Sequence, residues 1–198
     1  MTYEPISTRF PFGFSEEVEA AFEFLIGGYG FSCVKSDPTF VRFESSSAFV
    51  NVSYDHISYE LDIEIGSATQ PPDRAVQGFG LSEILELAGV LEETGYTFFQ
   101  ASTKERVKRL VARLAALTRD YAGPALVGDT STFEALAAIR TARSSRYMKE
   151  MRLSQIREAA DIAWRAKDYL KVIELYEGMG ADLSDLEAKK LQYVRSHI

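Results

Sequence analysis

The segment "FVNVSYDHISYELDIEIG", residues 49–66, constrains the fold more than any other part of the chain. Apolar and polar residues alternate along it, which is typical of strands that bury one face and leave the other in water. Asp55-His56 divides the segment and predicts a tight turn. With a two-residue turn, the apolar residues pair on one face: Tyr54 with Ile57, Val52 with Tyr59 and Val50 with Leu61. Glycine is more usual than histidine at the second turn position, so a slightly longer loop also fits.

Two further strand-like runs precede this hairpin. "FSCVK" (31–35) and "TFVRFES" (39–45) flank the turn-forming "SDP". Before them, residues 15–26 have helical periodicity, with Ser15 as a candidate N-cap and Gly27-Gly28 as the expected end. We therefore predict an α+β unit: a four-stranded antiparallel meander packed on an N-terminal helix.

The second half of the chain predicts helices. "STKERVKRLVARLAALTRDYAG" opens with a capping box formed by Ser102 and Glu105 and continues with an apolar stripe. Similar periodicity continues to the end of the chain and predicts a C-terminal bundle of about four to five helices. We expect two domains, an acidic α+β sheet domain over 1–100 and a helical domain over 101–198.

The two halves differ in the sign of their charge. Residues 1–100 carry 4 basic and 16 acidic residues, a net charge of −12, whereas residues 101–198 carry 18 and 13, a net charge of +5. The whole chain carries −7. This asymmetry indicates either that the halves neutralise each other or that one of them meets a partner of opposite sign.

Glu60, Asp62 and Glu64 form the most conspicuous candidate site, because alternation places all three on the polar side of one predicted strand. In the two-residue-turn register, Asn51 faces Glu60 on that side. Neighbours on this ladder lie about 6.6–6.8 Å apart, too far to hold one cation without help from another strand. Three interpretations stay open: a solvated sheet face, a docking surface for a basic partner, and a metal or acid/base site. We select these four residues as the candidate partner-binding site and predict no metal ligands.

A second candidate is a basic band in the helical half. Its members recur every three residues: Arg140, Arg143, Arg146, Lys149 and Arg152. Arg157 follows five residues later. Because an α-helix has 3.6 residues per turn, these side chains spiral around the helix instead of forming a straight row. The band is an alternative anion- or nucleic-acid-binding site, although the acidic chain and the absence of a known motif make nucleic acid the weaker partner. A solvated helix, or a salt contact with the acidic half of the same chain or of a second copy, is the other interpretation.

Little in the sequence points to catalysis. The two histidines, His56 and His197, form no recognisable catalytic arrangement, and "GGYG" (27–30) lacks the lysine and the preceding strand of a phosphate loop. We predict no catalytic residues and no cofactor, and keep a carboxylate-dependent enzyme as the third hypothesis.

Other features concern the environment of the chain. The only cysteine, Cys33, excludes an intramolecular disulfide and is expected to be a small buried residue of its strand. No apolar run reaches 18 residues, so we expect no transmembrane helix, no membrane partner and a cytoplasmic location.

The segment near 153–198 resembles a tetratricopeptide-type helical hairpin. The matching residues are Ala163, "KDY" (167–169) and "VIELYE" (172–177). Trp164 is not at the usual aromatic position, and no proline follows the second helix. A single unit cannot build the peptide-binding groove of a repeat array, so the resemblance implies a packing module and carries over no binding residues.

The whole chain also resembles bacterial immunity-type proteins, through "FLIGGYGF", "VRFESSSAFVNVSYD" and "SYELDIEIG". The resemblance implies a small acidic cytoplasmic protein that neutralises a toxin by binding it. The acidic ladder would then be the dock for a basic toxin. Our leading expectation is a non-enzymatic protein-binding module, and a homo-oligomer is an open possibility.

Overall fold

A computed structural model describes residues 12–69 and 78–197. The chain forms two compact units, Met1–Arg140 and Thr141–Ile198, and helix α7 (Thr130–Arg165) contributes residues to both. The units therefore divide after Arg140, whereas the sequence placed the boundary after residue 100. The reason is helix α5 (Lys104–Tyr121), whose apolar stripe, including Val107, Val111 and Leu114, lies in the same core as the strands.

Over the described residues, the first unit contains a six-stranded antiparallel sheet, which confirms the predicted α+β class and the antiparallel meander. Four strands follow one another along the sheet: β1 (Ser32–Asp37), β2 (Phe40–Glu44), β3 (Ala48–Tyr54) and β4 (Glu60–Ser67). Two short strands, β5 (Phe79–Gly80) and β6 (Phe99–Gln100), both pair with β4 at separate positions. They extend the predicted four strands to six.

The β3–β4 hairpin has the predicted faces but a different register. Val50 pairs with Ile65, Val52 with Ile63 and Tyr54 with Leu61, so the predicted two-residue turn is wrong. The loop is longer because the Asp55 carboxylate accepts hydrogen bonds from the backbone N–H groups of Ile57 and Ser58, and this side chain organises the turn. Each β3 residue pairs with a β4 residue that lies four positions later than predicted. Because four is an even number, the same side of each strand still faces the core.

The N-terminal helix is split in two. Helix α1 (Phe14–Ala21) and helix α2 (Glu23–Tyr29) meet at Phe22, which is fully buried. The helix also continues through Gly27 and Gly28, where the sequence predicted its end. It stops at Gly30, whose φ of 71° lies in the left-handed region that glycine adopts without steric cost.

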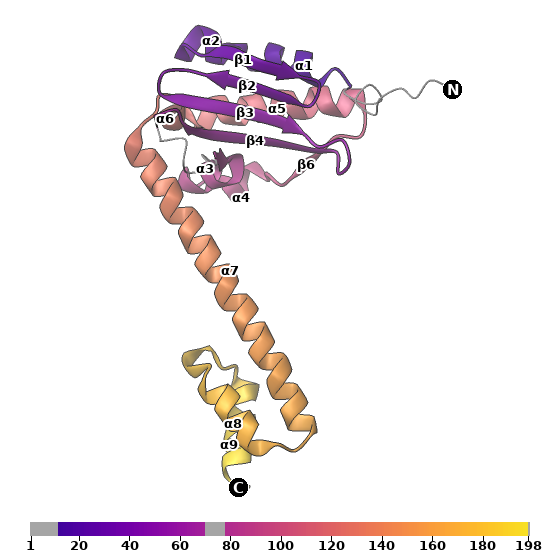
Figure 1. Cartoon of the computed structure of the whole chain (residues 1–198), viewed down its shortest axis with the longest axis vertical. Coiled ribbons are helices and arrows are strands. Elements are labelled where there is room, and N and C mark those ends of the chain that lie inside the picture. The colour runs from indigo at the N-terminus through magenta and orange to yellow at the C-terminus, as the bar shows by residue number, and fades with distance from the viewer. Residues whose placement is uncertain (1–11, 70–77, 198) are drawn as a thin grey trace, which may run out of the picture. The chain divides into compact units, whose positions relative to one another are not determined.

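Helices cover one face of the sheet. Buried residues of α1, α2 and α5 belong to one core together with the apolar faces of β2, β3 and β4, and Figure 1 shows α5 passing behind the strands. The N-cap of α5 is Thr103, whose hydroxyl accepts a hydrogen bond from the Arg106 N–H, rather than the predicted Ser102. The described part of this unit also contains the start of α7 and three short helices: α3 (Leu81–Leu87), α4 (Leu91–Thr94) and α6 (Gly123–Leu126).

The second unit is helical throughout its regular structure. It contains the C-terminal part of α7, helix α8 (Tyr169–Glu177), a short 3-10 helix (Gly180–Asp182) and helix α9 (Asp185–Arg195). Their core is separate and small: Ala160, Ala163, Val172, Tyr176, Met179, Leu191 and Val194. Asp168 and Ser184 cap α8 and α9 with their side chains. The C-terminal helical region is thus confirmed, whereas the tetratricopeptide-like character stays a prediction.

Cys33 differs from its predicted environment. Strand β1 is the outermost strand of the sheet, and its register shifts between Cys33 and Lys35. Because an edge strand with such a bulge does not keep strict alternation toward the core, Cys33 is exposed rather than buried.

Candidate functional site

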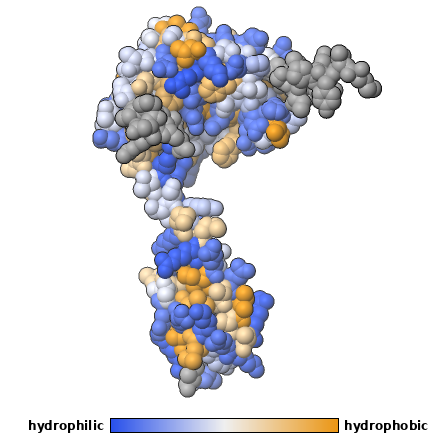
Figure 2. All heavy atoms as spheres, viewed as in Figure 1, coloured by the Kyte–Doolittle hydropathy of each residue, from blue (hydrophilic) through white to orange (hydrophobic). Residues whose placement is uncertain are grey.

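Strand β4 carries the predicted acidic ladder. Its buried residues Leu61, Ile63 and Ile65 alternate with the ladder residues, so the three carboxylates lie on the face opposite the core. Asp62 is exposed, and Glu60 and Glu64 are half-buried. Hydrophilic residues cover much of this side of the first unit in Figure 2.

Asn51 joins the site, but at a different point of the ladder than predicted. It pairs with Glu64 across the β3–β4 ladder and donates a side-chain hydrogen bond to the Glu64 carboxylate. Its Oδ1 atom accepts a hydrogen bond of 3.2 Å from Arg42 Nη1. Arg42 in turn stacks on the Phe49 ring and bonds Glu44 at 3.0 Å. Asn51 therefore links the Arg42 network to one end of the ladder.

The charge of Arg140 acts on Glu64 from a distance, but among the described residues no cation forms an ion pair with the ladder. Among residues 12–69 and 78–197, no ion pair involves Glu60, Asp62 or Glu64. Surrounding protein atoms desolvate the Asp62 carboxylate and raise its pKa, and the Glu60 charge raises it further. Burial and the Asp62 charge likewise raise the pKa of Glu64, although the Asn51 hydrogen bond and the Arg140 charge lower it in part. These shifts mean that the folded protein concentrates negative charge that an incoming cation would stabilise.

Tyr96 lies close enough to the ladder to respond to its charge. Burial raises the pKa of Tyr96 to about 12, and the Asp62 charge contributes to this increase. The effect of Asp62 on Tyr96 shows that the charge of the ladder reaches the segment that precedes β6.

Exposed apolar side chains gather at the Glu60 end of the ladder. Ile57 in the β3–β4 loop is 79 % exposed, and Phe98, which directly precedes β6, is 80 % exposed. The Ala101 N–H donates to the Tyr59 carbonyl at 2.8 Å, and Gln100 pairs with Glu60, so these two segments are adjacent. We call Ile57, Tyr59 and Phe98 the apolar rim. The sequence pattern did not predict it, because the predicted register placed Ile57 and Tyr59 in the core.

Tyr59 has an uncommon backbone conformation. Its φ is 59°, in the left-handed region that non-glycine residues rarely adopt. This geometry holds a 38 % exposed aromatic ring next to Glu60 at the start of β4. Such strain is often found where a loop presents a side chain for recognition.

The predicted basic band is divided. Arg140 belongs to the first unit and the other four residues belong to the second. Arg140 donates to the buried Glu83 carboxylate at 2.5 Å and 2.8 Å and to the Gly78 carbonyl at 2.9 Å. Lys149 pairs with Asp182 at 2.6 Å, and Arg143 is half-buried. Within the described part of the chain, Arg146 and Arg152 are the only members of the band that are exposed and make no ion pair or side-chain hydrogen bond, so the band offers less free positive charge than its sequence indicates.

The described residues offer no metal site. No group of three or more His, Cys, Asp or Glu side chains within 12–69 and 78–197 has the geometry to hold a metal ion. His56 is exposed in the β3–β4 loop, and His197 stacks on Tyr193 with ring centroids 4.0 Å apart. Over the same residues, no helix combines the length and the apolar character needed to span a membrane.

Comparison with known proteins identified no relative of this chain. No protein-family model, curated protein sequence or solved structure matches this chain. The acidic ladder and the apolar rim are therefore the features of the described residues that bear on function.

Proposed function

We propose that this chain is a non-enzymatic protein-binding module that docks a basic protein on the open face of its sheet. The observation that carries the proposal is the adjacency of three carboxylates without ion pairs to the exposed apolar rim. An acidic cluster alone is often a solvated surface. Exposed aromatic side chains, by contrast, are enriched in protein interfaces, and charged side chains surround such apolar contacts at the interface edge.

The two parts of the surface would contribute differently to binding. Glu60, Asp62 and Glu64 would attract a positively charged surface over a distance and raise the rate of association. Phe98 and Tyr59 would provide the desolvated aromatic contacts from which interfaces gain most of their affinity. Cations of the partner would also relieve the unfavourable environment that raises the pKa of Asp62 and Glu64.

The resemblance to immunity-type proteins favours a toxin as the basic partner. In this proposal the chain binds the toxin in the cytoplasm and blocks it, without chemistry of its own. The arrangement of the ladder carboxylates favours a binding role over a catalytic one, because they follow one another along a strand instead of converging on one point.

The alternatives receive weaker support. An anion- or nucleic-acid-binding role would use the basic band, but Arg140 and Lys149 are engaged with Glu83 and Asp182. A carboxylate-dependent enzyme would need two carboxylates facing one substrate bond. The ladder does not provide that arrangement on a single strand.

The test is a capture experiment with four purified, immobilised proteins and a lysate of the source cells. These are the wild type, the Glu60/Asp62/Glu64→Lys variant, the Phe98→Ser variant and a charge-matched control. The control reverses Glu16, Glu23 and Glu105, three exposed acids on helices of the opposite side of the sheet. A basic protein should be retained by the wild type and the control and lost from the other two variants.

Dissociation constants then follow from titration of the purified partner. We expect each variant of the ladder or the rim to bind at least about tenfold more weakly, the equivalent of about 1.4 kcal/mol. Binding to the wild type should weaken as salt rises, because part of the attraction is between charges. Equal retention of the partner by the ladder variant and the control would show that the ladder is only a solvated face.

A further inference from the structure

We propose that the first unit contains a second site, a pocket that binds a small, neutral, apolar molecule. The pocket has a volume of about 370 Å³ and lies between the end of α3, the α5–α6 junction and the first turns of α7. This volume is in the range of sites that bind small ligands. It is separate from the acidic ladder, and the inference does not depend on the proposed function.

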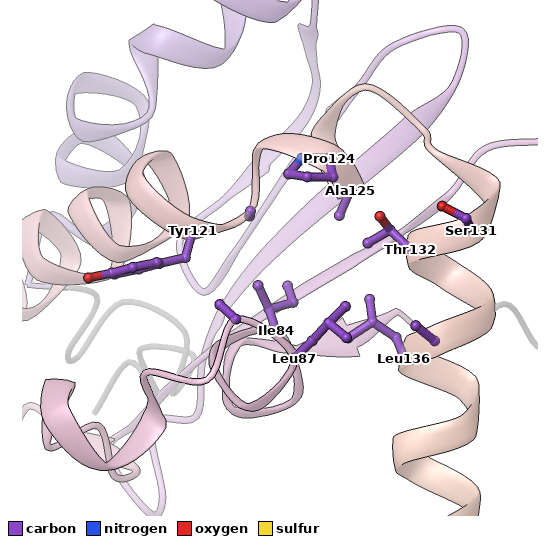
Figure 3. Close-up of a pocket in the computed structure, with 11 residues that line it drawn as sticks. Ile84, Leu87, Tyr121, Pro124, Ala125, Ser131, Thr132 and Leu136 are labelled. Atoms are coloured by element: carbon purple, nitrogen blue, oxygen red, sulfur yellow. The ribbon is translucent and has the colours of Figure 1, made fainter.

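The space exists because small residues line it. Four of the eleven lining residues are alanines: Ala88, Ala122, Ala125 and Ala135. Around them, Ile84 and Leu136 are almost completely buried and belong to the core of the unit. The inner wall is therefore fixed by core packing and is present before a ligand arrives, whereas Leu87, Ala88 and Pro124 lie exposed at the mouth. Figure 3 shows Ile84 and Leu87 facing Pro124 and Ala125, with Thr132 and Leu136 beside them.

The hydroxyl groups of the lining residues are hydrogen-bonded to Asp129 or point away from the other labelled residues of the pocket. Asp129 caps α7 and accepts hydrogen bonds from the Ser131 hydroxyl at 2.7 Å and from the Thr132 hydroxyl and backbone N–H. The Tyr121 hydroxyl points away from the other labelled residues in Figure 3. The interior thus presents hydrocarbon surface and few free donors.

The chemistry of the lining selects the class of ligand. None of the eleven lining residues carries a formal charge. Burial of a charged group without a partner is costly, so a ligand whose charge must enter the pocket would bind poorly. A neutral aromatic or aliphatic molecule would bury apolar surface against the alanine, leucine and isoleucine side chains.

The test uses two fluorescent probes that differ by one charged group. N-phenyl-1-naphthylamine is neutral, and 8-anilinonaphthalene-1-sulfonate has the same ring system with a sulfonate. Titrations of the intact chain at about 0.15 M salt screen the long-range repulsion by its net negative charge. We expect saturable binding of one neutral probe per chain and roughly tenfold or more weaker binding of the sulfonate.

Two filling variants and a matched control locate the probe. Ala135→Leu and Ala88→Leu place a larger side chain into the pocket from two different elements, and each should weaken binding of the neutral probe by roughly tenfold or more. Ala138→Leu makes the same change at an exposed position of α7 outside the lining and should leave the affinity unchanged. The use of two filling variants keeps the test informative if one of them folds poorly, which circular dichroism would reveal.

Three outcomes would overturn the proposal. The first is equal affinity of the wild type and both folded filling variants, and the second is the absence of saturable binding. The third is equal binding of the sulfonate probe, which would contradict the ligand class. None of these results bears on capture of a basic protein by the ladder, so the two proposals fail independently.

Discussion

At the scale of single residues, the carboxylate of Glu187 is held by two neighbours, one close to it in the chain (Ser184) and one distant (Arg157). Its carboxylate accepts hydrogen bonds from Arg157 Nε at 2.8 Å and from the Ser184 N–H at 2.7 Å. Burial acts to raise the pKa of Glu187, but the hydrogen bonds from Arg157 and Ser184 outweigh it and lower the pKa to about 2. Ser184 and Glu187 form a capping box for α9, a pattern visible in the sequence. The contact with Arg157 depends on tertiary structure.

The lowered pKa predicts a pH-dependent stability of the second unit. A carboxyl group with a lowered folded-state pKa stabilises the fold above its ordinary pKa near 4.5, and this stabilisation disappears as the pH falls toward 2. The Glu187→Gln variant keeps an acceptor for the capping box but loses the charge. Because Arg157 is 44 % exposed and solvent screens the pair, we expect a loss of only about 1 kcal/mol at pH 7.

Urea unfolding followed by Trp164 fluorescence measures this effect, since Trp164 is the only tryptophan and lies in the second unit. The difference in unfolding free energy between wild type and variant should shrink as the pH falls from 6 to 3. A constant difference over this range would rule out the charge of Glu187 as its cause.

At the scale of elements, Gly27 inside α2 and Gly30 directly after it play opposite roles. Gly27 lies inside the helix and has no atom within 4 Å of an added Cβ, whereas Gly30 ends the helix at a φ of 71°. The sequence predicted the end at Gly27-Gly28 because glycine often ends helices. The helix continues because Leu25 and its neighbours are held in the core, and tertiary packing outweighs weak local propensity.

This difference predicts substitutions of opposite sign. Gly27→Ala should stabilise the first unit by about 0.5–1 kcal/mol, since alanine loses less conformational freedom than glycine in a helix. Gly30→Ala should destabilise the unit by about 1–2 kcal/mol, because alanine is strained in the left-handed region. Urea unfolding followed by far-UV circular dichroism gives both values. Two changes of the same sign would contradict the assigned helix end.

At the scale of the whole molecule, the division into units alters the meaning of the charge asymmetry. Residues 1–140 carry 11 basic and 20 acidic residues, a net charge of −9, and residues 141–198 carry 11 and 9, a net charge of +2. Much of the positive charge attributed to a helical domain therefore belongs to α5, which packs on the sheet. The first unit is acidic, and the second is nearly neutral.

The separate cores predict two unfolding transitions. Among the described residues, the buried core of the second unit has seven members and that of the first has 28. A smaller core provides less stabilisation, so the second unit should unfold at a lower urea concentration. Trp164 fluorescence reports this unit alone, and far-UV circular dichroism reports both. Coincident curves from the two probes would show that the units unfold as one.

The sequence alone determined which faces of the strands are buried, because alternation is a local property that survives any even change of register. Val50, Val52 and Tyr54 therefore lie in the core, and the three ladder residues lie opposite, as predicted. The end caps at Ser184 and Asp168 are local in the same way, since each side chain bonds a backbone N–H three residues later.

Only the tertiary structure decided which segments meet. It set the partner of Asn51, exposed Ile57 and Phe98 beside the ladder, placed α5 in the first unit and left the alanine-lined pocket between α3, α5, α6 and α7. These outcomes depend on packing between residues far apart in the chain, for which alternation and helical periodicity carry no information. The register of a hairpin depends on its loop, and here the side chain of Asp55 and the left-handed Tyr59 selected a loop longer than the pattern indicated.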